Sequence, residues 1–497
     1  MGAEQIVKKE KIAIIGAGPG GLAAGMRLSS AGYEVDIYEK NAFIGGRTSR
    51  LTLGDYKFDI GPSSITMPHT LTALFMESNR NLEDYVTLVP VEPMYKLFFN
   101  NGQTFSPYHD QLQTIRELNE HFPNNEKNYL RYMNENAKKS LYLAPLMMSS
   151  LSSLWDYFKP TMLRALPSLS LGRNLADETS RFFTDENLRL AFSFQVRNMG
   201  MSPSTTPGMY SIIPFSEFYY GLYHPIGGHS QLFKAISDVI LENGGRIHLN
   251  AEVEHFSFHN KQIVGFTLKS GEHIQADKYI INTDYAYTMT ELMHDTPPPK
   301  NLTKKKFSTS AFMIYLGLNK TLPLEHQSVI FPENYKQYED ELIHLKTLPE
   351  DFTVYVVNPS VSDTTMAPIG HTALRIMVLV PNNESQINWD KERQAFEQKV
   401  LSVVKERLHI PDLEEHIVEK KVLTPKEWEN DFHLYQGAIH GLVRSIKQTG
   451  TGHPVHRLQK KFPNLFVVGT SAHPGTTLPY IIESANFVAE QIKKTKT

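Results

Sequence analysis

The first residues with a spacing that could do chemistry form a glycine-rich turn near the N-terminus. The apolar, β-rich run KIAII (residues 11–15) leads directly into Gly16-Ala17-Gly18-Pro19-Gly20-Gly21. In such a GxGxxG turn, Gly16 permits the tight bend, Gly18 lets backbone N–H groups approach a pyrophosphate, and Gly21 lets the next helix pack closely. The pattern predicts a dinucleotide site, with a turn that binds nothing as the alternative.

The neighbouring segments are those that must position this turn. Residues 21–31 (GLAAGMRLSSA) predict a helix whose N-terminal dipole faces the anion, and Gly32 ends it. Residues 34–39 (EVDIYE) alternate like a second, parallel strand, and Glu39 at its end can accept hydrogen bonds from both ribose hydroxyls. The strand, turn, helix and acid together predict a Rossmann-like unit.

Composition restricts what the rest of the chain can be. With 497 residues, 41% hydrophobic and 21% charged, it is a globular protein of two or more domains. A net charge of −3 and scattered basic residues indicate no nucleic-acid partner. The chain has no cysteine, which excludes disulfides, thiolate metal sites and catalytic thiols, and we expect no metal. No signal-peptide pattern or run of about 20 apolar residues occurs, so we expect a soluble or surface-bound protein.

A second glycine motif follows Glu39. The triplet Gly45-Gly46-Arg47 resembles the second signature of the FAD-binding family typified by amine oxidases and phytoene desaturases. The resemblance implies FAD as the cofactor, with the backbone of Gly45 and Gly46 and the side chain of Arg47 on its pyrophosphate. An exposed loop arginine is the alternative.

The middle of the chain alternates between two kinds of sequence. Residues 58–62 (FDIGP) resemble the segment that returns the chain towards the flavin in this family, and residues 70–223 have helical spacing. Beyond Gly227-Gly228 we expect a helix over 230–242 and strands over 247–253, 262–268 and 279–281. Related flavoproteins place Val253 near the adenine, although a simple core valine is the alternative.

Residues 297–435 mix strand-like runs (312–318, 374–380) with an amphipathic helix (390–408). We therefore expect an α/β fold, with a Rossmann-like FAD-binding domain of the amine oxidase and phytoene desaturase type and an inserted α+β substrate domain. The FAD-binding domain would comprise residues 1–69, 225–296 and 436–497. The substrate and membrane-associated domain would comprise residues 70–224 and 297–435.

The C-terminal region repeats the strand, turn and helix pattern. The run NLFVV (residues 464–468) leads to Gly469 and to His473-Pro474-Gly475, and a helix is expected through Ala489. With Pro479, this region resembles the C-terminal signature of bacterial-type phytoene desaturases, and the resemblance spans essentially the whole chain. Residues 210–214 (YSIIP) and Gly227-Gly228 resemble the branch that desaturates the thirty-carbon diapophytoene.

The resemblance implies that the backbone from Gly469 to Gly475 binds the isoalloxazine, with Leu478 and Pro479 beside the ring. We interpret His473 as a turn residue with a local hydrogen bond in preference to a catalytic role.

A carotenoid precursor offers no heteroatom, so the flavin must supply the reactivity. Hydride transfer from an allylic C–H bond followed by proton loss would make the double bond, and Glu483 is the candidate base or electrostatic stabiliser. A solvent-facing helix glutamate is the alternative for Glu483.

An apolar substrate also needs a path through the protein. We expect a crowded aromatic stretch to form a tunnel, with core packing as the alternative: Phe192, Phe194, Tyr210, Phe215, Phe218, Tyr219, Tyr220 and Tyr223. Residues 141–171 combine Leu, Met, Trp and Phe with Lys159 and Arg164, as an interfacial helix pair would, although a buried hairpin has the same pattern. We expect a cytoplasmic protein attached peripherally to the inner face of the cell membrane.

Three other functions share these motifs. A terminal-methyl oxygenase acting on diaponeurosporene resembles the same family. An amine oxidase shares the N-terminal unit, but a thioether link to flavin is excluded because the chain lacks cysteine. Isoprenoid carriers of the GDP dissociation inhibitor type reuse the fold without flavin, and the complete C-terminal segment argues against them. The residues do not indicate which electron acceptor reoxidises the flavin.

Overall fold

The computed structural model describes residues 9–147, 155, 158–293, 302–443, 448, 454–475 and 477–495. Its first sheet has five strands, all parallel where they pair. In spatial order these are β19 (Leu465–Val467), β13 (Lys278–Ile281), β1 (Lys11–Ile15), β2 (Glu34–Tyr38) and β9 (Arg246–His248). Such a sheet needs cover on both faces.

Side chains of β1 point alternately to the two faces of the sheet, and other elements cover each face. Ile12 and Ile14 point into a core shared with α1 (Pro19–Ser30), α2 (His69–Glu77), α9 (His229–Glu242) and α15 (Leu478–Lys494). Ala13 and Ile15 point the other way. There they meet α10 (Tyr285–Tyr287), α14 (Pro454–Lys461) and the antiparallel strands β10 (Val253–His259), β11 (Gln262–Leu268) and β12 (His273–Ile274). The unit is therefore a three-layer sandwich.

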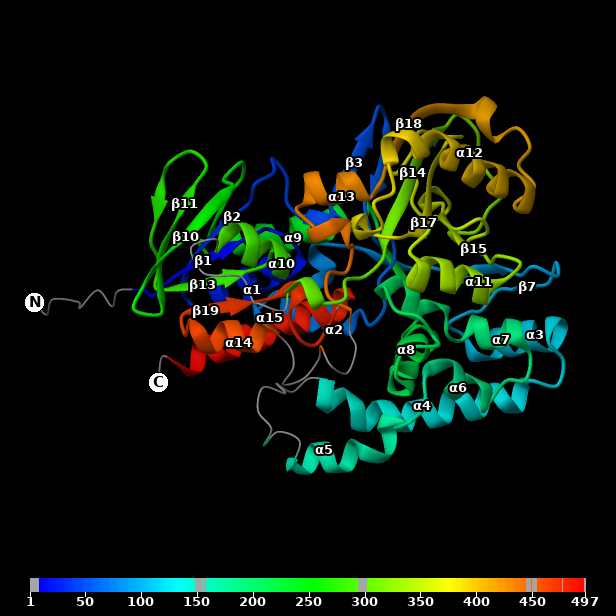
Figure 1. Cartoon of the computed structure of the whole chain (residues 1–497), viewed down its shortest axis with the longest axis horizontal. Helices are drawn as coiled ribbons and strands as arrows, with labels where there is room; N and C mark the ends of the chain where they lie inside the picture. Colours follow the sequence, from blue (N-terminus) through cyan, green and yellow to red (C-terminus); the bar gives the residue numbers. More distant parts are fainter. Residues whose placement is uncertain are drawn as a thin grey trace, which may run out of the picture.

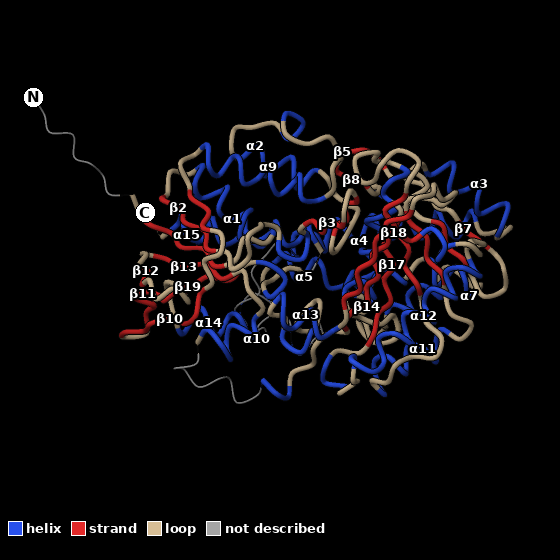
Figure 2. The backbone as a smooth tube through the Cα atoms, turned by 90° about the horizontal axis from the view of Figure 1, so that it is seen from above, coloured by secondary structure: helices blue, strands red, loops and turns tan. Residues whose placement is uncertain are grey.

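A second, seven-stranded sheet lies at the opposite end of the molecule (Figure 2). Its order is β18 (Ile417–Leu423), β14 (Ser310–Leu318), β17 (Thr372–Val380), β16 (Val354–Val357), β15 (Gln327–Ile330), β6 (Lys96–Phe98) and β7 (Thr104–Phe105). Only β15 and β6 pair in parallel among these strands. One face packs on α12 (Trp389–Arg407) through Phe312 and Phe396, whose ring centroids are 5.0 Å apart.

Helices below this sheet complete the molecule (Figure 1). They are α3 (Gln111–His121), α4 (Glu126–Met147), α5 (Pro160–Ala165), α6 (Leu175–Ser180), α7 (Glu186–Ala191) and α8 (Ile212–Tyr220). Further elements are α11 (Tyr335–Asp340), α13 (Pro425–Phe432) and a hairpin of β3 (Arg50–Leu53) with β4 (Tyr56–Asp59). The strands β5 (Leu88–Pro90) and β8 (Tyr223–Pro225), which are far apart in the sequence, form a second antiparallel pair. No helix within the described ranges is both long and apolar enough to span a bilayer.

The predicted fold class is confirmed, because a parallel α/β unit is combined with an α+β region. Every strand of the five-stranded sheet falls within the segments predicted for FAD binding, and every strand of the seven-stranded sheet falls within the others. Two details differ. The strand expected over 247–253 is divided between β9 and β10, and α2, beyond residue 69, packs against α1 and α15.

Candidate active site

A cavity of about 430 Å³ is lined by residues of both sheets. At one end, called here the nucleotide end, it is lined by Gly16, Gly18, Gly20, Glu39, Gly46, Arg47, Val253 and Asn282. At the other, called the apolar end, it is lined by Tyr95, Phe194, Glu217, Val329, Tyr355, Met377 and Leu379. Gly469, Leu478 and Pro479 also line it. One cavity thus joins the first fifty residues to the seven-stranded sheet and the C-terminal helix.

The glycines at the nucleotide end are fixed by close backbone approach. Gly16 has φ +97, a conformation that side chains disfavour. A Cβ on Gly20 would lie 2.7 Å from the amide nitrogen of Gly469, so the N-terminal and C-terminal turns touch. A Cβ on Gly21 would collide with the carbonyl oxygen of Gly16, which is the close helix packing this position was expected to need.

Glu39 is 5% exposed and is oriented by the turn that it faces. Its Oε2 accepts the Ala17 N–H at 2.9 Å, while Oε1 accepts the backbone and side-chain N–H groups of Asn41 at 3.0 and 2.8 Å. A carboxylate offers about four acceptor positions, so it keeps capacity for a ribose hydroxyl.

Asn282 follows β13 and was not singled out from the sequence. Its Nδ2 donates to the Gly16 carbonyl at 3.2 Å, and the same atom lies 2.8 Å from where a Cβ on Gly18 would sit. Its Oδ1 lies 2.7 Å from the corresponding point on Gly20. The sequence did carry a signal for Asn282. It is a polar residue directly after the predicted strand 279–281, and ligands bind at the carboxyl ends of such parallel strands.

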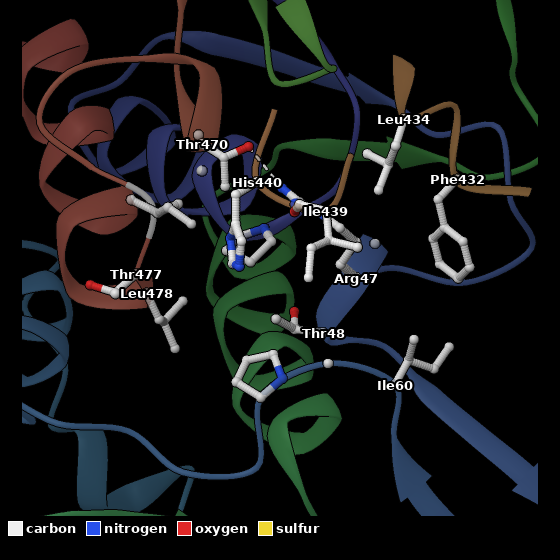
Figure 3. Close-up of a pocket in the computed structure, with 18 of the residues that line it drawn as sticks. Arg47, Thr48, Ile60, Phe432, Leu434, Ile439, His440, Thr470, Thr477 and Leu478 are labelled. Carbon is white, nitrogen blue, oxygen red and sulfur yellow. Dashed lines mark hydrogen bonds between the residues drawn. The ribbon is translucent and has the colours of Figure 1, made fainter. Parts of the chain in front are cut away.

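Arg47 crosses the cavity to the C-terminal segment (Figure 3). Its guanidinium donates to the Ile439 carbonyl and, at 2.8 Å, to the Thr470 hydroxyl. Burial lowers the pKa of Arg47, and the charge of Asp284 opposes that effect. Burial likewise raises the pKa of Asp284, which caps α10 by accepting the backbone N–H groups of Ala286 and Tyr287. The guanidinium is thus held beside the glycine turns by groups from three distant segments.

Alternate residues of the seven-stranded sheet form the apolar end. On β17, Arg375, Met377 and Leu379 face the cavity, while Leu374, Ile376 and Val378 face the core. Ala311 and Met313 of β14, Val329 of β15 and Tyr355 and Val357 of β16 follow the same rule. The period of two thus turns alternate residues of these four strands, β14, β15, β16 and β17, towards the cavity.

The predicted aromatic tunnel is wrong for most of its residues. Of the eight aromatics expected there, Phe194 lines the cavity and the other seven are not among its described lining residues. Phe192 instead stacks between Phe183 and Phe218, with ring centroids 4.6 Å from each, in the main core. Tyr219 is 52% exposed. Core packing, the alternative considered for this stretch, accounts for the buried phenylalanines.

The remaining predicted site residues do not all reach the cavity. Gly21, Gly45 and Gly475 are absent from the described lining; Gly45 donates its N–H to the Ala17 carbonyl at 2.8 Å, and Gly475 packs against Tyr480. Glu483 is also absent from that lining: it lies half-buried on α15 and accepts a hydrogen bond from Asn486 at 3.2 Å. Its role as a base stays a prediction.

Glu217 on α8 is an acidic residue that sequence reasoning missed. It lines the apolar end, with the polar side chains of Tyr95 and Gln195 beside it. Burial raises the pKa of Glu217 to about 8, although the polar side chains of Gln195 and Tyr95 oppose the rise. An acidic residue inside the aromatic run FSEFYY was the signal, because a carboxyl group among aromatics is costly to bury.

The nucleotide end fits FAD. The N-terminus of α1 has no side-chain cap at Gly18, so its first-turn amides are not satisfied by a capping side chain. Glycines leave no Cβ where the two turns touch, at Gly20 and Gly469, while Arg47 supplies a cation and Glu39 supplies the ribose acceptor. A pyrophosphate is bound by such backbone N–H and guanidinium donors, and a ribose hydroxyl is bound by the carboxylate.

Comparison with known proteins agrees with this site. The model of the family described as flavin containing amine oxidoreductase matches residues 19–493. The 4,4'-diapophytoene desaturase (4,4'-diapolycopene-forming) of Methylomonas sp is 37% identical over 487 residues, covering 97% of this chain and 95% of the relative. The 4,4'-diaponeurosporene oxygenase of Staphylococcus haemolyticus is 29% identical, covering 98% of this chain and 97% of the relative.

Among solved structures, an oxidoreductase from Methanosarcina mazei superposes with a TM-score of 0.62 at 19% identity, covering 97% of this chain and all of that one. This likeness concerns the fold. Together, the matched family model and the fitted nucleotide end make FAD the cofactor of an oxidoreductase. The chain belongs to the flavin-containing amine oxidoreductase family.

Proposed function

We propose that this protein desaturates 4,4'-diapophytoene, a thirty-carbon apolar polyene precursor, to 4,4'-diaponeurosporene or 4,4'-diapolycopene. The observation that carries the proposal is the cavity itself, which runs from the dinucleotide turn to apolar side chains of the seven-stranded sheet. The relative from Methylomonas sp, whose name is that of a diapophytoene desaturase, supports the substrate class. Bound FAD would accept the two electrons of a C–H bond.

The residues that would hold FAD follow from the geometry. Glu39 would accept a ribose hydroxyl, with Val253 near the adenine at the same end of the cavity. The backbone of Gly16, Gly18 and Gly20 with the N-terminus of α1, together with Gly46 and Arg47, would hold the pyrophosphate. Gly21 would let α1 pack closely, and Gly45 would position the second turn through its bond to Ala17. Gly469 to Gly475 would approach the isoalloxazine, with Leu478 and Pro479 beside it.

The apolar end would orient the polyene without specific polar contacts. Met313, Val329, Val357, Met377 and Leu379 present aliphatic or thioether surface to the cavity. Burial of a hydrocarbon chain there contributes about 25 cal/mol per Å² removed from water. Holding the chain in one path beside the flavin sets which C–H bond reacts.

Pigment production tests this proposal. The gene is expressed in cells that make either thirty-carbon or forty-carbon phytoene, and the carotenoids are identified by chromatography and mass spectrometry. We expect coloured, oxygen-free products from the thirty-carbon precursor. Colour only from the forty-carbon precursor contradicts the chain length, and products carrying terminal oxygen favour the oxygenase alternative.

We further propose that the protein attaches peripherally to the cytoplasmic face of the membrane, where such a substrate dissolves. Exposed apolar side chains gather on α5 and its flanks: Leu141, Trp155, Phe158, Leu163, Leu166 and Leu171. Lys159 and Arg164 are exposed among them, as anionic headgroups would require. The opposite side of this segment, with Leu143, Met162 and Ala165, packs on a cluster that contains Tyr480, one residue after Pro479. Residues 148–154 and 156–157 of the predicted membrane segment lie outside the described residues.

Liposome cosedimentation tests the attachment. Replacing Leu163 and Leu166 (53% and 42% exposed) by Asp is expected to lower binding to vesicles that contain anionic lipid. Leu345→Asp is the matched control, because Leu345 is 61% exposed on a different part of the surface. Equal loss in both variants, or none in either, contradicts the proposal.

A further inference from the structure

The apolar end of the cavity contains one carboxyl group among its described lining residues, that of Glu217. The cavity's other carboxyls, Glu39, Glu252 and Asp284, lie at the nucleotide end or beside Arg47. Arg375, which also faces the apolar end, is a permanent cation and cannot accept a proton. Glu217 is therefore the one carboxyl group that the described residues place at the apolar end, against an apolar substrate.

Two buried polar side chains lie beside the Glu217 carboxyl. Tyr95 and Gln195 are 3% and 2% exposed, and the Gln195 Nε2 donates to the Tyr95 hydroxyl at 2.9 Å. Both polar side chains lower the pKa of Glu217, which means that they favour its carboxylate form over its acid form. The Gln195 Oε1 is buried with no hydrogen-bond partner among the described atoms. Once Glu217 has taken up a proton, its O–H group can donate a hydrogen bond. Such a donor is the partner that the Gln195 Oε1 lacks.

The cost of this arrangement points to a role in the reaction. A carboxyl group in an apolar wall costs free energy whether it is ionised or neutral, and an aliphatic residue would line the cavity without that cost. Among the described residues, no cationic side chain forms an ion pair with Glu217. Structural stability therefore gives no reason for an acid at this position.

We infer that Glu217 is the catalytic base of the proposed desaturation. The inference rests on that proposed function. Each new double bond requires the loss of two hydrogens: one C–H bond gives a hydride to FAD, the oxidant. The neighbouring C–H bond gives its proton to the Glu217 carboxylate, and its electron pair becomes the new π bond. The carboxyl is then neutral, and it releases the proton to water between turnovers.

The rate should therefore depend on the ionisation of Glu217. Burial raises the pKa of this carboxyl to about 8, so its reactive carboxylate increases as the pH rises through that value. The titratable groups that face it are Tyr95 and Tyr132, and burial raises the pKa of each far above its usual range. Both tyrosines are neutral near pH 8, which leaves the carboxyl as the group that titrates.

The test uses the flavin-loaded protein and 4,4'-diapophytoene in phosphatidylcholine vesicles. Single-turnover bleaching of the flavin is followed without oxygen from pH 6 to 9 for wild type, Glu217→Gln, Glu217→Asp and the surface control Glu186→Gln. We expect Glu217→Gln to lose about 100-fold or more in rate and to lose the rise near pH 8. Glu217→Asp should keep the rise at a lower rate, and Glu186→Gln, whose side chain is 91% exposed, should match wild type.

Two further measurements keep the inference falsifiable. In wild type, the infrared band of a protonated carboxylic acid should titrate near pH 8 and be absent in Glu217→Gln. If Glu217→Gln does not fold, Tyr95→Phe should move the rise to higher pH, because Glu217 loses a polar neighbour that lowers its pKa.

The inference is overturned if Glu217→Gln reacts within about threefold of wild type with the same pH dependence. It is equally overturned if Glu483→Gln abolishes the rise and Glu217→Gln does not. A wild type that leaves the polyene unchanged overturns the proposed function, and the role of Glu217 with it, whereas an unaffected Glu217→Gln beside an active wild type overturns the role alone.

Discussion

The guanidinium of Arg47 donates a hydrogen bond of 2.8 Å to the hydroxyl of Thr470, a residue 423 positions further along the chain. The two residues belong to the two segments whose glycine turns touch at Gly20 and Gly469. The contact therefore closes the FAD site across the whole length of the polypeptide, and it places a cation where the phosphate charges are expected.

Replacing Arg47 by Ala should weaken FAD binding. Loss of a charged hydrogen-bond donor costs about 1.5–3 kcal/mol, which corresponds to a rise of about 10- to 100-fold in the FAD dissociation constant. Titration of the apoprotein with FAD, followed by flavin fluorescence, measures it. Thr470→Val removes only the neutral partner, so its effect should be several times smaller. Equal effects of the two variants would show that Arg47 acts through Thr470 and not through the cofactor.

Asn282 provides a test of charge at the same place. Its amide touches the glycine turn where the pyrophosphate is expected, so Asn282→Asp would bring a negative charge towards the phosphates. We expect Asn282→Asp to lower FAD affinity more than Asn282→Ala, which removes the hydrogen bond to Gly16 without adding charge. The difference should shrink in high salt, because exposed charges are screened. A weaker effect of Asp than of Ala contradicts a phosphate at this turn.

Gly20→Ala tests the contact between the two turns. The new Cβ would lie 2.7 Å from the Gly469 nitrogen, a distance that forces backbone to move. Such overpacking costs about 1–3 kcal/mol of unfolding free energy, and FAD occupancy should fall with it. Urea unfolding and the flavin-to-protein absorbance ratio measure the two effects. Gly102→Asn is the control, because nothing lies within 4 Å of its Cβ position and Asn tolerates the φ of +81.

A buried ion pair beneath the cavity should govern the dependence of stability on pH. His224 faces two acceptors, the Ser63 carbonyl and the Asp363 carboxylate, each at 3.0 Å, so its ring must be protonated to donate to both. Burial would raise the pKa of Asp363, but hydrogen bonds from His224, Thr365 and Gly227 outweigh it and lower the pKa to about 2. Burial would lower the pKa of His224, but the Asp363 hydrogen bond outweighs it and raises the pKa.

The signs of these shifts define a pH window. The contribution of Asp363, about 2 kcal/mol, is complete above its unfolded pKa near 4 and is lost as the pH falls towards 2. The contribution of protonated His224 is complete below its unfolded pKa near 6.5 and is lost as the pH rises through its higher folded pKa. Asp363→Asn should therefore destabilise the protein most between about pH 4 and 6.5. A destabilisation that is constant from pH 3 to 9 would contradict an ionised pair.

The sequence alone determined the parts of the site that depend on local backbone chemistry. The turn from Gly16 to Gly21 and the acid at Glu39 have meaning within one strand, turn and helix, because glycine conformation and strand ends are local properties. The same reasoning predicted β11, α9, β17 and α15 to within a few residues. It also indicated the FAD-binding family through Gly45-Gly46-Arg47.

Only the tertiary structure decided which side chains share the cavity. The sequence near Phe192 was equally compatible with a substrate tunnel and with a hydrophobic core. The structure shows Phe192 packed against Phe183 in the core. The cavity wall instead comes from alternate positions of separate strands, whose cavity face depends on how the sheet docks onto the FAD-binding unit. Asn282 and Glu217 gained their positions in the same way. Their roles depend on neighbours that are distant in sequence, such as Gly469 and Tyr95, and no local pattern encodes which neighbours those are.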